Sequence, residues 1–431
     1  MFTPEKRKEI VVGVVGLGYV GLPLAVRAKE KGYSVLGFER TAEKAEIINS
    51  GKSPFEDDYL EENLPKHPVE ATTDTSRLKE CDIILICVPT PVDALHNPDL
   101  KPVRGASESV AENLKPGALV VLESTVNPGV SEEVIKPIFE KAGYKIGEDV
   151  FIAHCPERIN PGDPKWNVTN IPRVVGAFTE KGLEKAVSFY ESIIDGEIKP
   201  MKHIREAEAC KVVENSFRDI NIAFVNELAK SFDAMNIDVK DVIDGAATKP
   251  FAFLPHYPGR GIGGHCIPVD PYYLIERAKQ AGFDHKFLRT SRAINNSMPA
   301  YTVELLQDKL NEVKMPLNGT KVGLLGIAYK PNIDDDRESP YYQIVAELNK
   351  HKAEIISYDP HLPEKSDVNA LEDILEQAEA LIYVTNHQEF ENVLNGELLK
   401  KYDIKVVVDG VNTLDKEDIL AQGILYKGIG R

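Results

Sequence analysis

A glycine-rich stretch, Pro258 to Pro271, contains the side chain best suited to covalent chemistry, Cys266. Four glycines in seven residues let the backbone approach a ligand closely and adopt positive φ angles. Cys266 follows His265 and precedes Asp270 by four residues, and a helix is predicted over Tyr272 to Gln280. A thiol beside a histidine and near a helix start can have a lowered pKa and act as a nucleophile. The alternative is a turn that buries the cysteine as a small apolar residue.

A second motif, Gly16-Leu17-Gly18-Tyr19-Val20-Gly21, lies between a predicted strand, Ile10 to Val15, and a predicted helix, Leu22 to Lys31. Glycines at this spacing allow a tight turn, close approach of a pyrophosphate and close packing of helix on strand. The helix N-terminus would hold the pyrophosphate. The next predicted strand ends at Glu39, 18 residues after Gly21, where a carboxylate would bind the ribose hydroxyls. The motif predicts a dinucleotide site; Glu39 favours NAD, and Arg40 leaves NADP as the alternative.

Further α/β alternation predicts a doubly wound sheet, in which ligands bind beyond the carboxyl ends of the strands. Polar or turn residues that directly follow a predicted strand are therefore site candidates, although each could equally be ordinary loop chemistry. These candidates are Pro89, Thr90, Thr125 and Glu157.

A helical pattern of 30 residues runs from Glu206 to Met235 without Gly or Pro. Its apolar face is broad, and its length suits a helix that links two α/β domains and packs against a partner. Lys211, Asn215 and Arg218 fall at positions i, i+4 and i+7, so they share one face. This face is either part of a site or a solvated polar surface.

A second α/β region begins after the linker Pro316 to Gly319. Its first loop, Ala328 to Arg337, is dense in charge and leads into a helix at Pro340, so it also lies at a ligand-binding edge. The predicted fold class is α/β, with two Rossmann-like doubly wound domains joined by a central helical domain that contains one long helix. The predicted domains are residues 1–203, 204–312 and 313–431.

Composition narrows the function classes. The formal net charge of −17 argues against nonspecific binding to nucleic acid or anionic membranes. No apolar run is long enough to span a membrane, and the N-terminus has no apolar segment of a secretory signal. The five cysteines are scattered and lack CxxC spacing, which predicts a reducing cytoplasm and neither a disulfide framework nor a Cys-rich metal site.

Together these motifs resemble the UDP-glucose/GDP-mannose dehydrogenase family of nucleotide-sugar 6-dehydrogenases over nearly the whole chain. The matching pieces, in family order, are Gly16 to Pro23, Val88 to Pro91, Glu123 to Val126 with Pro128-Gly129, Pro156 to Arg158, Lys211 with Asn215, Gly261 to Asp270, and Lys330 to Pro340.

The resemblance implies a role for each matching residue. It makes Cys266 the nucleophile, surrounds the reacting oxygen with Lys211, Asn215 and Asp270, makes Glu157 a base or water-positioning residue, and has Thr125 hold a catalytic water. The implied substrate residues are Glu157, Arg158, Lys211, Asn215, Arg218, Tyr257, Gly259, Arg260, Gly263 and Lys330. The implied cofactor residues are Gly16, Gly18, Tyr19, Val20, Gly21, Glu39, Arg40, Pro89, Thr90, Thr125 and Arg337. No metal is implied.

The resemblance also implies a reaction and partners. The C6 alcohol of a UDP-sugar would be oxidised to a uronate through a Cys266 thiohemiacetal and thioester, with two NAD+ per turnover, in a homodimer or an assembly of dimers. Arg260 would bind substrate, reaching across the dimer interface.

The sequence around the cysteine indicates a branch of this family. The UDP-glucose branch usually has Ser-Cys-Phe-Pro-Lys-Asp, whereas this chain has His265-Cys266-Ile267-Pro268-Val269-Asp270. That run and the stretch Phe217 to Phe224 resemble the branch that acts on UDP-N-acetyl-D-mannosamine or UDP-N-acetyl-D-glucosamine, with the mannosamine form favoured. That branch usually has Pro at the position of Arg260, which is a departure from its pattern.

Three alternatives stay open from the sequence. A single-step β-hydroxyacid dehydrogenase also has Lys and Asn four residues apart, but it needs no cysteine and no second α/β domain. A short-chain epimerase needs Tyr-x-x-x-Lys, and none of the 16 tyrosines has Lys four residues later. A regulatory nucleotide-binding subunit would not require the full set of reactive residues.

Overall fold

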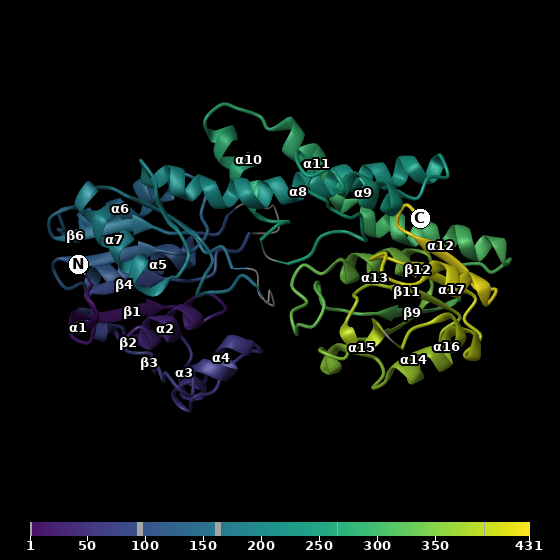
Figure 1. The fold of residues 1–431 in the computed structure, drawn as a ribbon, viewed down its shortest axis with the longest axis horizontal. Helices are drawn as coiled ribbons and strands as arrows, with labels where there is room; N and C mark the ends of the chain where they lie inside the picture. The colour runs from purple at the N-terminus through teal and green to yellow at the C-terminus, as the bar shows by residue number, and fades with distance from the viewer. Residues whose placement is uncertain (1, 93–97, 160–164, 265, 392) are drawn as a thin grey trace. The chain divides into compact units, whose positions relative to one another are not determined.

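The computed structural model of the chain describes residues 2–92, 98–159, 165–264, 266–391 and 393–431 (Figure 1). Contacts between Cα atoms divide it into two compact units. The first contains the residues up to Glu214 together with Tyr272–Phe283, and the second contains Asn215–Pro271 together with Asp284–Arg431. His265, the neighbour of Cys266 in the sequence, lies outside the described residues.

The first unit is built on an eight-stranded sheet in the order β3-β2-β1-β4-β5-β6-β7-β8. Its strands are β1 (Val11–Val15), β2 (Ser34–Phe38), β3 (Glu70–Thr72), β4 (Ile83–Ile86), β5 (Ala118–Leu122), β6 (Val150–His154), β7 (Arg173–Ala177) and β8 (Ile198–Pro200). The six strands from β3 to β6 in that order are parallel, whereas β7 is antiparallel to β6. The order of these six is that of a doubly wound dinucleotide-binding sheet, with its switch point between β1 and β4.

Side chains of this sheet alternate between two apolar layers, one on each face. Val12 and Val14 of β1 belong to one layer, and Ile84 and Ile86 of β4 belong to the other. Because parallel strands are covered on both faces, their sequences are almost continuously apolar. The helices of this unit are α1 (Pro4–Arg7), α2 (Gly21–Glu30), α3 (Ala42–Asn49), α4 (Asp58–Asn63), α5 (Lys101–Glu112), α6 (Lys136–Lys141), α7 (Glu180–Ile193) and α10 (Asp270–Gln280).

Helix α8 (Ile204–Ala234), teal in Figure 1, is 31 residues long and continues from the first unit into the second. The long helix predicted from the apolar periodicity is therefore confirmed. In the second unit, α8 contributes Val225 and Ala229 to an apolar core that also includes β9 and β12 residues such as Val322 and Val406.

The second unit is built on a five-stranded parallel sheet in the order β10-β9-β11-β12-β13. Its strands are β9 (Lys321–Leu325), β10 (Glu354–Tyr358), β11 (Ala380–Tyr383), β12 (Val406–Asp409) and β13 (Leu425–Gly428). The switch point lies between β9 and β11, so ligands are expected beyond the ends of these two strands. The helices of this unit, apart from α8, are α9 (Val239–Ala247), α11 (Lys286–Asn296), α12 (Met298–Glu312), α13 (Pro340–Lys350), α14 (Leu371–Gln377), α15 (Gln388–Glu391), α16 (Gly396–Lys401) and α17 (Lys416–Ala421).

The predicted fold class is confirmed: two Rossmann-like parallel sheets and one long helix. Strands β3, β8 and β13 were not predicted from the sequence, because each contains only three or four residues, several of them polar, which is too short for a clear strand pattern. The division into three domains at residues 203/204 and 312/313 stays a prediction. No helix in the described ranges has both the length and the apolar composition needed to cross a membrane.

Candidate active site

The glycine-rich loop after β1 is shaped by close contacts. Gly16 has a φ of +93°, and a Cβ there would lie 2.8 Å from the carbonyl oxygen of Cys87. A Cβ on Gly21 would overlap the carbonyl oxygen of Gly16, whereas a Cβ on Gly18 would meet no described atom within 4 Å. Gly16 and Gly21 thus let α2 start directly behind β1, and Gly18 leaves space in front of the helix N-terminus, where a pyrophosphate would be held.

Glu39 follows β2 and turns back toward this loop. Its Oε2 accepts a hydrogen bond from the Leu17 N–H at 3.4 Å, and its Oε1 accepts one from the Arg40 N–H at 2.8 Å. The side chain of Arg40 is exposed, and that of Tyr19 is half-buried in the loop. Val20, which precedes α2, has no side-chain group to cap the helix. In the first turn the Leu22 N–H donates to the Gly18 carbonyl oxygen and Pro23 has no N–H, so a ligand at this helix start would bind through the Gly21 N–H. These residues fit NAD, which when bound supplies a hydride acceptor.

Three further candidates follow neighbouring strands of the first sheet. Thr90 comes after β4, Thr125 after β5 and Glu157 after β6. Because these strands are parallel neighbours, all three residues lie at the carboxyl edge. Tyr273 of α10 donates its hydroxyl hydrogen bond to the carbonyl oxygen of Thr90 and so fixes the turn that contains Pro89.

A buried ionic cluster supports this edge. Arg173 of β7 donates to Oε2 of Glu123 at 3.0 Å and to Oε2 of Glu157 at 2.8 Å, and the Tyr190 hydroxyl donates to Glu123. Arg173 and Glu123 have no exposed surface. No role was predicted from the sequence for Arg173 or Glu123; the available signal was a charged residue beside an apolar strand, with Arg173 at the start of β7 and Glu123 directly after β5.

Both carboxylate oxygens of Glu157 are occupied. Oε1 accepts from the N–H groups of Arg158 and Ile159, each at 2.6 Å, while Oε2 accepts from Arg173. Donors on both oxygens hold the carboxylate in one orientation. This arrangement suits the positioning of a water molecule better than the uptake of a proton.

The cluster has unusual proton affinities. Burial raises the pKa of Glu123 to about 7, an effect that Arg173 opposes and Glu157 reinforces. Burial alone would lower the pKa of Arg173, but the carboxylates of Glu157 and Glu123 raise it well above its ordinary value. The guanidinium therefore stays charged, and Glu123 takes up a proton near neutral pH.

The N-terminal part of α8 is tied to loops of the first sheet. Arg158 forms a two-point ion pair with Glu214, with Nη2–Oε1 and Nε–Oε2 distances of 2.7 Å and 3.1 Å. Buried Glu208 accepts from the N–H groups of Gly129 and Ser131 at 2.6 Å and 2.7 Å. The loop that follows Thr125 is thereby fixed by the same helix that carries Lys211.

Lys211 and Asn215 stand one turn apart on α8, and both are buried. The Nδ2 of Asn215 donates to Oδ2 of Asp270 at 2.5 Å, which brings together two residues separated by 55 positions in the sequence. Arg218, placed on the same face by its spacing, is exposed. Arg218 therefore lies in solvent, whereas Lys211 and Asn215 are covered by other parts of the protein.

Cys266 lies in the turn that leads into α10. Its carbonyl oxygen accepts hydrogen bonds from the N–H groups of Val269 at 3.1 Å and Asp270 at 2.8 Å. The side chain of Cys266 is half-buried. The carboxylate that binds Asn215 thus belongs to the same turn as the thiol.

The glycines before Cys266 are required by packing against a second loop, Ala328 to Arg337. A Cβ on Gly263 would lie 2.5 Å from Cβ of Tyr329, and a Cβ on Gly264 would lie 2.8 Å from Cε2 of the same ring. Gly264 has a φ of +84°, and its N–H donates to the carbonyl oxygen of Arg337 at 3.0 Å. The two loops that the sequence marked as chemically active are therefore in direct contact.

Arg260 extends from the cysteine loop to the carboxyl edge of the second sheet. Its N–H donates to the carbonyl oxygen of Gly410 at 2.9 Å, and its Nη2 donates to the carbonyl oxygen of Tyr329 and to Oγ1 of Thr385, each at 3.3 Å. Its buried Nε has no hydrogen-bond partner among the described residues. Burial lowers the pKa of Arg260 to about 10, with Asp409 opposing, so the side chain remains a cation at neutral pH.

Lys330 and Arg337 belong to the loop that follows β9. The guanidinium of Arg337 binds the carboxylate of Asp335, with Nε–Oδ1 and Nη2–Oδ2 distances of 2.9 Å and 2.5 Å. Lys330 is half-buried between Tyr329 and Pro331. Arg337 thus forms an ion pair with Asp335, and its backbone contacts the cysteine loop at Gly264.

The two remaining substrate candidates lie before Arg260. The hydroxyl of Tyr257 donates to Oδ1 of Asp244 at 2.7 Å, and the N–H of Gly259 donates to Oδ1 of Asn226 at 3.0 Å. These contacts fix the chain that enters the cysteine loop.

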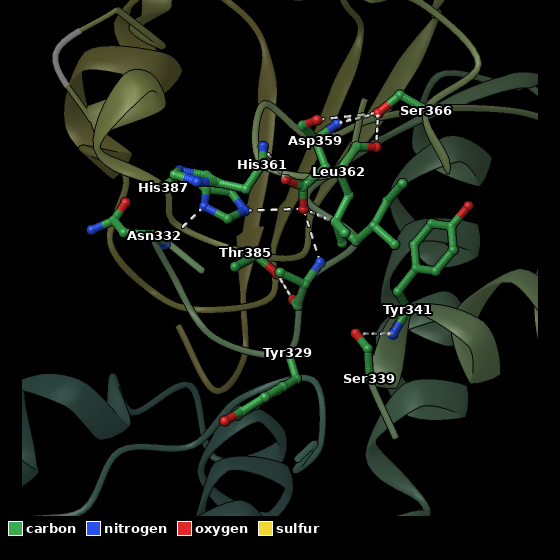
Figure 2. A network of polar contacts seen from close by, with 12 residues as sticks. Tyr329, Asn332, Ser339, Tyr341, Asp359, His361, Leu362, Ser366, Thr385 and His387 are labelled. Atoms are coloured by element: carbon green, nitrogen blue, oxygen red, sulfur yellow. Dashed lines mark hydrogen bonds and ion pairs between the residues drawn. The ribbon is translucent and has the colours of Figure 1, made fainter. Parts of the chain in front are cut away.

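One group in the second unit has the composition of a metal site: His361, His387 and Glu389, whose possible ligand atoms lie within 4.8 Å of one another. However, both ring nitrogens of His387 are already in hydrogen bonds (Figure 2). Nδ1 accepts from the Asn332 N–H at 2.9 Å, and Nε2 lies 3.1 Å from Oδ2 of Asp359. His387 therefore has no lone pair available for a metal in this arrangement.

The Glu123 cluster predicts a specific pH dependence of stability. The folded chain holds a proton on Glu123 up to about pH 7, whereas an unfolded chain releases it near the ordinary value of 4.5. The contribution of this group to the free energy of unfolding is therefore greatest below pH 4.5 and is lost as the pH rises to 7, by about 3 kcal/mol. Urea unfolding of wild type and Glu123→Gln between pH 4.5 and 8 is expected to show a shallower decline for the variant.

The matched control is Glu62→Gln, which removes a carboxylate from an exposed ion pair with Lys66. It is expected to keep the wild-type pH dependence. Identical profiles for wild type and Glu123→Gln would contradict the proton assignment.

Sequence comparison matches three domains of one family in chain order. Residues 10–194 match the NAD binding domain of the UDP-glucose/GDP-mannose dehydrogenase family. Residues 205–297 match its central domain, and residues 323–416 match its UDP binding domain.

Individual relatives give the same result over the full length. A UDP-N-acetyl-D-mannosamine dehydrogenase from Pyrococcus horikoshii is 35% identical over 424 residues, which cover 97% of this chain and 99% of the relative. A UDP-N-acetyl-D-glucosamine 6-dehydrogenase from Pseudomonas aeruginosa is 36% identical over 435 residues, covering 96% and 99%. A solved structure of a UDP-D-ManNAc dehydrogenase from Pyrococcus horikoshii superimposes with a TM-score of 0.91 at 34% identity, covering 98% of this chain and 99% of that one.

The dinucleotide loop, the second parallel sheet and these full-length matches lead to one conclusion. The chain belongs to the UDP-glucose/GDP-mannose dehydrogenase family and is an NAD-dependent oxidoreductase of the nucleotide-sugar 6-dehydrogenase type.

Proposed function

We propose that the protein oxidises the C6 alcohol of a UDP-N-acetylhexosamine to the uronate in two successive NAD-dependent oxidations. The main observation that supports this proposal is the position of Arg260. An arginine from the cysteine loop reaches the ligand-binding edge of the second sheet, where its buried Nε lacks a partner among the described residues. A guanidinium in this position suits a phosphate oxygen. The UDP binding domain match and the names of the relatives support the same substrate class.

The substrate diphosphate requires local cations because the chain as a whole carries a charge of −17. Arg260 and Lys330 supply them at the edge of the second sheet. Hydrogen bonds to Tyr329 and Thr385 hold the Arg260 guanidinium at the carboxyl edge of the second sheet, so we propose that it binds the substrate of its own subunit. The other proposed substrate residues are Glu157, Arg158, Lys211, Asn215, Arg218, Tyr257, Gly259 and Gly263.

The proposed chemistry explains the need for a nucleophile. Conversion of an alcohol to a carboxylate removes four electrons, so two NAD+ are consumed per product. After the first oxidation, the thiolate of Cys266 adds to the aldehyde carbon and forms a thiohemiacetal. The second oxidation leaves a thioester, which water hydrolyses to release the uronate and regenerate the thiol. Covalent capture prevents the loss of a reactive aldehyde between the two oxidations.

The residues proposed to act with Cys266 suit the charges that develop. Each tetrahedral oxyanion needs hydrogen-bond donors, and Lys211 and Asn215 provide them from adjacent turns of one helix. The hydrogen bond from Asn215 to Asp270 orients the amide. Glu157, held on both oxygens, and Thr125 are proposed to position the water that attacks the thioester.

The cofactor residues are proposed as a set. NAD would be held by the glycine-rich loop and Glu39, with the remaining contacts from the strand ends and from Arg337. The full set is Gly16, Gly18, Tyr19, Val20, Gly21, Glu39, Arg40, Pro89, Thr90, Thr125 and Arg337.

UDP-N-acetyl-D-mannosamine is the favoured sugar nucleotide. The residues that flank Cys266 differ from the pattern of the UDP-glucose branch, and a mannosamine enzyme matches over 97% of this chain. The glucosamine enzyme has nearly the same identity, 36% against 35%, so identity alone does not separate the two sugars.

The scattered cysteines support a cytoplasmic location.

We also infer a homodimer, or an assembly of dimers, formed through an apolar groove of the second unit. Phe217 and Phe224 of α8 are 49% and 54% exposed, and they line a groove of about 560 Å³ together with Leu254. Exposed apolar surfaces of this kind mark protein contacts.

Light scattering is expected to give at least twice the chain mass of 47.8 kDa, and Phe224→Glu is expected to lower the measured mass. A wild-type mass of 47.8 kDa would contradict the inference.

The activity test counts NADH against substrate. The protein is incubated with NAD+ and, separately, with limiting UDP-N-acetyl-D-mannosamine, UDP-N-acetyl-D-glucosamine or UDP-glucose. Two NADH per UDP-N-acetyl-D-mannosamine are expected, because both oxidations occur before release. One NADH per substrate would support the single-step β-hydroxyacid type instead, and no NADH with any of the three would exclude this substrate class.

A further inference from the structure

The second sheet repeats the beginning of the first sheet position by position. In each, a strand ends at a glycine in the left-handed region, Gly16 with φ +93° and Gly326 with φ +98°. The N–H of each glycine bonds to the last residue of the neighbouring strand, β2 or β10. The residue that directly follows this neighbouring strand is acidic in both units: Glu39 follows β2, and Asp359 follows β10.

The two acidic residues act differently. Glu39 is half-buried and accepts from the Leu17 N–H at the long distance of 3.4 Å. Asp359 has no exposed surface, and its Oδ2 accepts from the N–H groups of Ile327 at 2.6 Å and Ala328 at 2.8 Å. An internal carboxylate thus binds two backbone N–H groups of the loop in the second unit, where Glu39 binds one N–H of the loop in the first.

His387 follows β11, on the other side of β9 from Asp359. Figure 2 shows its ring directed at the Asp359 carboxylate. A backbone N–H can only donate, so the bond from Asn332 makes Nδ1 an acceptor and places the ring proton on Nε2, which donates to Asp359. Burial alone would raise the pKa of Asp359, but the bonds from His387 and from the Ala328 N–H lower it to about 2. The carboxylate is therefore ionised at neutral pH.

The loop after β9 is consequently fixed at both ends. Thr385 donates to the carbonyl oxygen of Ala328 at 2.6 Å. Asn332, with a φ of +59°, is held by His387 and by the Gln388 N–H, which donates to its Oδ1 at 2.9 Å. Lys330 lies between these fixed points, and Pro331 restricts the backbone further.

We propose that Asp359 and His387 are positioning residues that hold the loop from Ile327 to Asn332 so that Lys330 meets the diphosphate of the nucleotide-sugar. This inference rests on the proposed function, because that function assigns Lys330 to the substrate. His387 has no exposed surface, and both of its ring nitrogens are engaged, so it acts through the loop rather than on the ligand.

The test measures UDP binding by calorimetry. Lys330→Ala is expected to weaken binding about tenfold, as for the loss of one charge-assisted hydrogen bond. His387→Ala is expected to have a similar effect. The double variant is expected to bind no more weakly than Lys330→Ala alone, because both changes remove the same interaction. In kinetics, the KM for the UDP-sugar is expected to rise while the KM for NAD stays unchanged.

Two variants that fill the site guard against a folding defect. In His387→Asn the amide oxygen can replace Nδ1 as the acceptor for the Asn332 N–H, whereas His387→Gln retains only a donor toward Asp359. The Asn variant is expected to bind UDP more tightly than the Gln variant. His351→Ala, a change at a partly exposed histidine of the same unit, is expected to bind UDP like the wild type.

The outcomes separate the two proposals. If the wild-type protein does not bind UDP, the proposed substrate class fails and this inference fails with it. If the wild type binds UDP but His387→Ala and His387→Gln bind it equally well, only the positioning role is overturned. Additive losses in the double variant would likewise overturn it, because they would place His387 on a pathway independent of Lys330.

Discussion

The packing of Gly263 and Gly264 against Tyr329 is the constraint on which the substrate half of the site depends. No side chain larger than hydrogen fits at either position, since a Cβ would lie 2.5 Å and 2.8 Å from atoms of Tyr329. This contact joins the loop that carries Cys266 to the loop that carries Lys330. Within this unit, the packing on Tyr329 and the hydrogen bonds from Gly264 to Arg337 and from Arg260 to Tyr329 therefore limit how far the nucleophile and the proposed phosphate-binding cation can move apart.

Buried charge is used in two ways in this acidic protein. In the first unit, Arg173 holds Glu123 and Glu157 at the carboxyl edge of the sheet and fixes the orientation of Glu157. In the second unit, Asp359 is satisfied by backbone N–H groups and by His387. In both cases a fully buried ionic group orders a loop that carries proposed substrate residues, and the cost of its burial is offset by several hydrogen bonds.

The sequence predicted the features that depend on local patterns. The G-x-G-x-x-G loop, the strand from Ser34 to Phe38 and the long helix were identifiable because their signals are contiguous. The networks around Arg173 and Asp359 were not, because their members come from different strands and no spacing connects them. The solvent exposure of helix residues could not be predicted from the sequence either. Helical spacing put Arg218 on one face with Lys211 and Asn215, yet only Lys211 and Asn215 are buried. Burial depends on what packs against a helix, which its own sequence does not state.

The proposed function depends most on the covalent capture of the aldehyde by Cys266 between the two oxidations. The most direct measurement is peptide mass mapping after acid quenching of a reaction with NAD+ and UDP-N-acetyl-D-mannosamine. A sugar-nucleotide adduct is expected on the peptide that contains Cys266, both in the wild type and in the control Cys210→Ala. Cys266→Ala is expected to carry no adduct and to make no uronate. Normal uronate formation by Cys266→Ala, with two NADH per product, would contradict covalent capture by Cys266.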